Sequence, residues 1–207
     1  MKKLLLLILL MFFTSIAYAC VTTPTNDSNQ DTGPIPLTTN LTDELRLERE
    51  YEGYSFIEDG IGEVEFYACN TGHSTDFREL GGDETFRTRY LGIDTPAPYT
   101  NPPEAWSLAV TDFVCDTLES AVRIVLEADP DASRRDSTSR QRYLVYVWYD
   151  DGQGELRNLN LELIELAYAR YTGASLYRDL LMDAWFEAQA TNRRIWGEDD
   201  PDPRTAD

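Results

Sequence analysis

The chain has 207 residues, 42% of them hydrophobic and 12% aromatic, which fits one globular domain with appendages and excludes a wholly disordered protein. Its 37 Asp and Glu outnumber its 18 Lys and Arg, so the formal net charge is −19. A field of that sign repels polyanions, and it disfavours nucleic acid as a partner unless a metal ion or a local basic patch intervenes.

The N-terminus predicts export. A positively charged start, an apolar run at 4–13 and the small residues of Ala-Tyr-Ala at 17–19 are typical of a signal peptide spanning residues 1–19. Cys20 follows directly and resembles the lipid-modified residue of bacterial lipoproteins, although Ala17 stands where that pattern usually has a larger aliphatic residue. We therefore expect a lipoprotein of the cell envelope, anchored to the membrane through Cys20, with simple secretion as the alternative.

Composition divides the rest of the chain into three parts. Residues 20–43 are rich in Thr, Asn, Asp and Pro, and they predict a flexible polar tether. Residues 44–199 contain the apolar periodicities of a folded domain, and residues 200–207 predict an acidic tail. We expect a monomer without an organic cofactor.

The first half of the domain predicts strands followed by a helix. Apolar and polar residues alternate at 64–68, as in a strand, and the Gly-Gly turn at 80–83 predicts a hairpin. The next strand is expected at 86–93 and a Pro-rich loop at 94–103. The Pro-Glu pair at 103–104 predicts the start of a helix, because Pro is tolerated in the first turn.

The second half predicts two more strands and then two helices. The strands are expected at 122–126 and 142–149, the second closed by the turn residues at 150–152. Apolar residues at helical spacing mark helices within 159–167 and 176–188. This order of elements predicts an α+β domain with a small barrel.

Three segments occur in an order that resembles a known family. Residues 89–96 read Arg-Tyr-Leu-Gly-Ile-Asp-Thr-Pro, and Arg142 opens a second strand. Asn160 leads an apolar helix, and Ile195 and Trp196 follow a closing helix. Over roughly residues 60–198 this set resembles the thermonuclease-like, or staphylococcal nuclease, family. The resemblance implies a five-stranded OB-fold-like β-barrel with about three helices.

The resemblance also implies calcium-assisted hydrolysis of phosphodiester bonds in nucleic acid. Arg89 and Arg142 would clamp the phosphate through charge-assisted hydrogen bonds. Asp94 and the backbone carbonyl of Thr95 would be calcium ligands. We expect Arg89, Arg142 and Asp94 to converge on one concave patch, with Ala97 on its rim.

The chain departs from the family at two positions that matter for catalysis. Ala97 stands where the family has its catalytic Glu, and Glu104 is a poor substitute because it belongs to the expected helix start. The family's Asp-Gly-Asp-Thr turn is expected within 73–77, with Thr75 or, after a one-residue shift, Asp76 in the place of the ligand Asp. Such a shift moves a side chain to the other face of a strand.

Three cysteines and a single histidine complete the candidate residues. If Cys20 carries lipid, Cys69 and Cys115 remain, and they either form a disulfide or stay as two buried thiols. His73 lies in a polar segment, and we expect it to be solvated.

Two hypotheses on function remain. The first is an exported, calcium-assisted nuclease with a weakened site, favoured by Arg89, Arg142 and Asp94. The second is a catalytically inactive OB-barrel binding module on a lipoprotein, favoured by Ala97 and the negative charge. In the second case the two arginines serve only as partners for nearby acidic residues.

Overall fold

The computed structural model describes residues 41–173 and 176–197, all within the unit Pro36–Asp207. The predicted signal peptide, Cys20, most of the tether and the acidic tail lie outside the described residues. No helix of the described part is long and apolar enough to cross a membrane.

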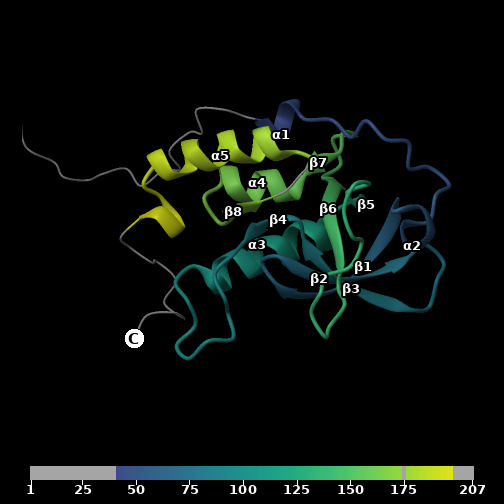
Figure 1. Cartoon of the computed structure of the whole chain (residues 1–207), viewed down its shortest axis with the longest axis horizontal. Coiled ribbons are helices and arrows are strands. Elements are labelled where there is room, and N and C mark those ends of the chain that lie inside the picture. The colour runs from purple at the N-terminus through teal and green to yellow at the C-terminus, as the bar shows by residue number, and fades with distance from the viewer. Residues whose placement is uncertain (1–40, 174–175, 198–207) are drawn as a thin grey trace, which may run out of the picture. The chain divides into compact units, whose positions relative to one another are not determined.

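Five strands close into a barrel (Figure 1). They are β1 Ile61–Thr71, β2 Ser74–Glu79, β3 Thr85–Tyr90, β5 Arg123–Glu127 and β6 Tyr143–Asp150. Neighbouring strands pair antiparallel in the order β3-β2-β1-β5-β6, and a parallel pairing of β3 with β6 closes the ring. The predicted five-stranded OB-fold-like barrel is therefore confirmed.

Three short strands complete the β structure. β7, Arg157–Asn158, extends the sheet beyond β6. β4, Gly92–Asp94, pairs antiparallel with β8, Arg170–Gly173, in a separate two-stranded sheet. The strand expected at 86–93 is thus divided between β3 and β4, and this division places Asp94 outside the barrel strands.

The helices comprise three longer ones and several single turns. The longer ones are α3 Ser107–Ser120, α4 Leu159–Glu165 and α5 Arg178–Ala190. The short ones are α1 Leu41–Glu44, α2 Phe56–Asp59 and the 3-10 turn η1 Arg194–Trp196. The predicted total of about three helices agrees with the longer set.

The predicted start of the first long helix at 103–104 is wrong by three residues. Helix α3 begins at Ser107, after Trp106, whose φ of 68° is not helical. Glu104 instead belongs to the preceding loop, because its backbone N–H donates to the carbonyl of Ala97 at 3.1 Å. That hydrogen bond closes the loop before the helix begins.

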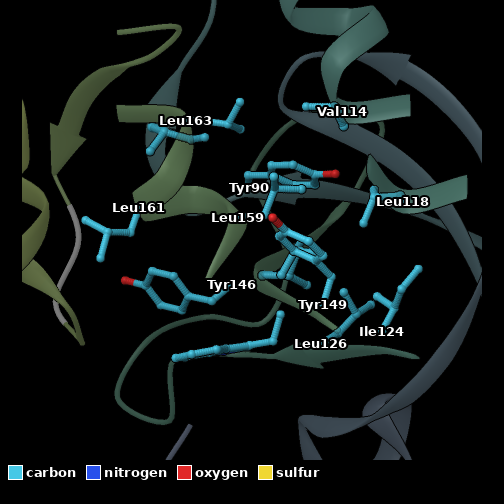
Figure 2. Packing of buried hydrophobic residues seen from close by; sticks show 14 of the residues in the cluster. Tyr90, Val114, Leu118, Ile124, Leu126, Tyr146, Tyr149, Leu159, Leu161 and Leu163 are labelled. Carbon is cyan, nitrogen blue, oxygen red and sulfur yellow. The ribbon is translucent and has the colours of Figure 1, made fainter. Parts of the chain in front are cut away.

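A shared apolar core joins the barrel to the helices. Strand β6 is buried along almost its whole length, as expected for a strand covered on both faces. Figure 2 shows side chains of β3, β5, β6, α3 and α4 gathered in this core. The labelled residues are Tyr90, Val114, Leu118, Ile124, Leu126, Tyr146, Tyr149, Leu159, Leu161 and Leu163.

The described fold begins inside the segment predicted as a tether. Glu165 of α4 is buried, and its Oε1 accepts a hydrogen bond from the backbone N–H of Leu41 at 2.7 Å. Its Oε2 accepts from the backbone N–H of Thr42 at 3.2 Å and from the Thr42 hydroxyl. Helix α1 is thus held on α4, so the last residues of the predicted tether, 41–43, belong to the fold.

A disulfide joins Cys69 of β1 to Cys115 of α3, with their Cα atoms 5.6 Å apart. Of the two alternatives that the sequence left open, the structure contains the bonded one. The bond fixes α3 against the end of β1, directly before the turn into β2. That turn belongs to the candidate site.

Candidate functional site

Arg89 and Asp94 meet at the connection between β3 and β4. Gly92 has a φ of 73°, the left-handed region that glycine adopts without strain, and the chain turns there. The turn brings Nη2 of Arg89 within 2.9 Å of Oδ1 of Asp94. Nη1 of Arg89 is buried and has no hydrogen-bond partner among the described residues. One of its donor groups is therefore unused.

Arg142 lies directly before β6 and is held by Asp136. Its Nε donates to Oδ2 of Asp136 at 2.8 Å, and its backbone N–H donates to Oδ1 at 3.1 Å. Its two Nη atoms have no hydrogen-bond partner within the described part of the chain. The parallel pairing of β3 with β6 brings this guanidinium to the side of the barrel where Arg89 lies.

The two guanidiniums influence each other electrostatically. Burial lowers the pKa of Arg89, the charge of Asp94 opposes this, and the charge of Arg142 lowers the pKa further. Repulsion of this kind requires that the two charges lie close together in a poorly hydrated region. The structure places the Arg89–Asp94 pair and Arg142 on the same side of the barrel.

His73 belongs to this site as well, although its place in the sequence did not predict this. Gly72 and His73 form the turn between β1 and β2. A Cβ at Gly72 would lie 2.7 Å from Val110 and 2.9 Å from Thr95, so only glycine fits this close approach. The His73 side chain is only 14% exposed, and its Nδ1 lies 2.7 Å from Oγ1 of Thr95. The prediction that His73 is solvated is therefore wrong.

Hydrogen bonding and electrostatics keep His73 neutral. Burial, with the charges of Arg89 and Arg142, lowers the pKa of His73 to about 3. Its Nδ1 accepts a hydrogen bond from the backbone N–H of Thr95 at 3.1 Å. In a neutral imidazole whose Nδ1 accepts, Nε2 carries the proton. His73 is therefore a neutral hydrogen-bond donor beside two guanidiniums.

A pocket of about 710 Å³ opens at this end of the barrel. Its lining contains three guanidiniums, one carboxylate, His73 and the exposed ring of Tyr99. The full lining is Asn70, Thr71, His73, Ser74, Asp76, Thr85, Phe86, Arg87, Tyr99, Arg140 and Arg142. Arg89 and Asp94 do not line it and lie beside its His73 wall. The pocket is thus a basic patch on a chain with a net charge of −19.

The two residues expected in place of the ligand Asp are engaged elsewhere. Thr75 points into the barrel, where its Oγ1 lies 2.7 Å from the hydroxyl of buried Tyr90. Asp76 lies on the other face and accepts from Nε and Nη2 of Arg87 at 2.7 and 2.8 Å. The one-residue alternation of a strand separates them, as predicted.

The alignment of the turn needs a correction. The turn between β1 and β2 consists of Gly72 and His73, whereas Thr75 and Asp76 lie within β2. Gly72 is the only glycine of residues 71–77, and it was the sequence signal that could have located the turn. The close approach of Val110 and Thr95 explains why a glycine is needed there.

The donors around Asp94 do not fit calcium. Calcium prefers six to eight oxygen ligands, whereas the turn presents an imidazole nitrogen that already accepts from Thr95. Asp94 is paired with Arg89, and His73 Nδ1 lies 3.7 Å from its Oδ1. Residues 41–173 and 176–197 contain no group of three or more His, Cys, Asp or Glu placed to hold a metal ion.

The loop after Asp94 contains no carboxylate in the place of a general base. Ala97 has only a methyl group, and its backbone N–H donates to Oε2 of Glu104 at 2.8 Å. Glu104 therefore uses its carboxylate to close the loop. Ala97 does not line the pocket, so its expected position on the rim is not found. The arrangement is equipped to bind an anion rather than to activate water.

The family model described as staphylococcal nuclease homologue matches residues 87–198, which is more than half of the chain. The match includes Arg89, Asp94 and Arg142 but begins after β2, so it excludes His73. No curated protein matches the chain.

Proposed function

Because the chain belongs to the staphylococcal nuclease homologue family, we propose that its barrel binds a phosphate group of a nucleic acid or another phosphodiester in the pocket lined by Arg142 and His73. The observation that carries this proposal is the guanidinium of Arg142, which lines the pocket and whose two Nη atoms have no hydrogen-bond partner among the described residues. Guanidinium groups bind phosphate oxygens through charge-assisted, often bidentate hydrogen bonds.

The two arginines have different parts in this function. Arg142 lines the pocket and offers both Nη atoms to a phosphate. Arg89 lies beside the pocket and adds positive potential, since it is poorly hydrated and its charge reaches His73. Arg140 and Arg87 line the same pocket, although the charge of Arg87 is matched by Asp76. The pocket therefore supplies the local basic patch that the negative chain otherwise lacks.

Calcium-assisted hydrolysis is the second candidate, and the Arg89–Asp94 pair at the family's spacing favours it. Ala97 and the use of Glu104 in closing the loop leave the attacking water without a base. Loss of a base lowers hydrolysis without abolishing what the guanidiniums contribute. We therefore place binding first and hydrolysis second.

The proposed place of action is the cell envelope. The signal-like N-terminus and Cys20 support a lipid-anchored barrel presented at a membrane surface, and secretion is the alternative. The disulfide between Cys69 and Cys115 suits a compartment outside the cytosol. Intact-mass analysis of membrane-extracted protein should show an added diacyl or triacyl group on Cys20.

The test of phosphate binding is fluorescence polarisation with the full chain and short labelled single-stranded DNA and RNA at low salt. Arg142→Gln should weaken binding by about tenfold or more, because it removes a charged hydrogen-bond donor. Arg123→Gln is the matched control, since Arg123 lies on β5 outside the pocket and contacts Tyr51 and Glu63. Absent binding, or equal losses in both variants, would refute the proposal.

The same samples can test hydrolysis. Gel analysis of the labelled strands with calcium or with chelator measures any cleavage by the wild-type chain. Ala97→Glu restores a carboxylate at the family's position and should raise cleavage by about 10² to 10⁴-fold if the second candidate is correct. If the wild type and Ala97→Glu both bind the strands without cleaving them, only the binding function is supported.

A further inference from the structure

His73 lies in the turn between β1 and β2, close to the segment where the family resemblance placed a calcium ligand, and its surroundings suit an imidazole. Gly72 allows the turn to approach Val110 and Thr95 closely, so His73 is held against the start of the loop after β4. Two groups of Thr95, its backbone N–H and its hydroxyl, lie at 3.1 and 2.7 Å from Nδ1. The ring is therefore fixed in orientation by a residue that the family uses for metal.

The charges at this position oppose a second cation. Arg89 is paired with Asp94, and no second carboxylate joins Asp94 in a group of three potential ligands within the described part of the chain. Arg142 adds a further positive charge close by. A divalent cation at this position would be repelled by the guanidiniums of Arg89 and Arg142. The carboxylate of Asp94, which would attract it, is already paired with Arg89.

Resting on the proposed phosphate binding, we propose that His73 replaces the metal ion: its Nε2–H donates to the bound phosphate, and the pocket binds its ligand without calcium. Thr95 is the positioning residue, because its N–H can donate only to an unprotonated Nδ1 and so places the ring proton on Nε2. His73 and Arg142 both line the pocket, and they form one set of anion donors. The ligand class is a phosphodiester or phosphate monoester recognised as an anion.

The first experiment uses the wild-type chain and needs no variant. Calcium chloride is titrated calorimetrically into the full-length protein, and Asp94→Asn is titrated in parallel. We expect no calcium uptake that depends on Asp94. Uptake that Asp94→Asn leaves unchanged belongs to other acidic residues and supports the proposal, whereas stoichiometric uptake that Asp94→Asn removes overturns it.

The second experiment measures the affinity for short labelled single-stranded DNA in chelator and in millimolar calcium. We expect the wild-type affinity to agree within about twofold between the two conditions, while His73→Asn should bind about five- to tenfold more weakly in both. Asn keeps an acceptor for the Thr95 N–H but lacks the Nε2–H donor. Thermal melting checks that the variant is folded.

His73→Asp is the matched gain-of-function variant. It places a second carboxylate beside Asp94, so DNA affinity should become calcium-dependent by about tenfold or more. Wild-type affinity that rises as strongly with calcium overturns the inference. Absent DNA binding in every condition refutes the proposed function instead, and the calcium titration still decides the metal question independently.

Discussion

Two polar clusters in this molecule use the same chemical groups in opposite ways. The pocket cluster consists of Arg142 and His73, which line the pocket, and of Arg89 and Asp94 beside them, and it contains guanidinium N–H groups without a partner among the described residues. Around Glu127, Oε2 of one buried carboxylate accepts two side-chain hydrogen bonds, and Oε1 lies 3.6 Å from Arg49. Guanidinium donors without a partner suit a cluster that binds an anion, whereas donors that share one buried carboxylate suit a cluster that holds the fold.

The Glu127 cluster joins elements that are distant in sequence. Oε2 of Glu127 accepts from Nε1 of Trp148 at 3.0 Å and from the hydroxyl of Tyr177 at 2.8 Å. Nη1 of Arg49 lies 3.6 Å from Oε1 and donates to the carbonyl of Ala128 at 3.1 Å. The N-terminal segment, β5, β6 and the start of α5 are thereby tied together.

The largest expected effect tests whether the pocket depends on the fold around it. Replacing Cys69 and Cys115 by Ser removes a cross-link with a sequence separation of 46, which should cost about 4 kcal/mol of unfolding free energy in the chain-entropy model. Urea denaturation measures the loss. Because the bond lies next to the turn that presents His73, DNA affinity should also fall, and unchanged affinity would show that the pocket does not need it.

Removing the carboxylate of Glu127 should separate stability from binding. Glu127→Ala leaves the indole N–H of Trp148 and the hydroxyl of Tyr177 without their buried acceptor, at an expected cost of about 3 kcal/mol. Urea denaturation measures this cost, and fluorescence polarisation should find DNA affinity unchanged. Weakened binding by the folded variant would contradict the separation of the two clusters.

A substitution in the pocket should have the opposite pattern of effects, with weaker binding and little change in stability. Arg142→Gln should lower DNA affinity by about 2 kcal/mol, since a charged hydrogen bond to phosphate is lost. It should change the free energy of unfolding by no more than about 1 kcal/mol, because Asp136 keeps hydrogen bonds from the backbone N–H of residue 142 and from the hydroxyl of Thr138. Polarisation and denaturation on one preparation measure both. A stability loss as large as that of Glu127→Ala would mean that Arg142 holds the fold.

The sequence predicted the architecture better than the site. Alternating and helical periodicities located parts of β1, β3, β5 and β6 and the three longer helices, because burial of one face dictates both patterns. Strand β2 lies where the sequence predicted a turn at 73–77. Arg89 pairs with Asp94 on the side of the barrel where Arg142 lies, although only Arg142 lines the pocket. His73 was missed because its role depends on a turn whose register is fixed by contacts with Thr95 and Val110, which lie on other elements. The pair of Arg142 and Asp136 likewise depends on the folded loop that brings Asp136 to Arg142.

The smallest expected effect concerns pH and again contrasts the clusters. Burial raises the pKa of Glu127, while hydrogen bonds from Tyr177 and Trp148 and the charge of Arg49 oppose the rise. A carboxyl whose pKa is higher in the folded than in the unfolded state stabilises the fold below its unfolded value of 4.5, and this contribution is lost as the pH rises through the folded pKa. Glu127→Gln has nearly the same shape but binds no proton there.

Comparing the wild-type chain with Glu127→Gln cancels every other titrating group. The free energy of unfolding of the wild type minus that of Glu127→Gln should therefore be largest below the unfolded pKa of 4.5 and should decrease toward neutral pH. Urea denaturation at several pH values measures this difference. An increase with pH would mean that Arg49 and the two donors stabilise the ionised carboxylate more than burial opposes it, and the Glu127 cluster would then be a matched ion pair like Arg142–Asp136.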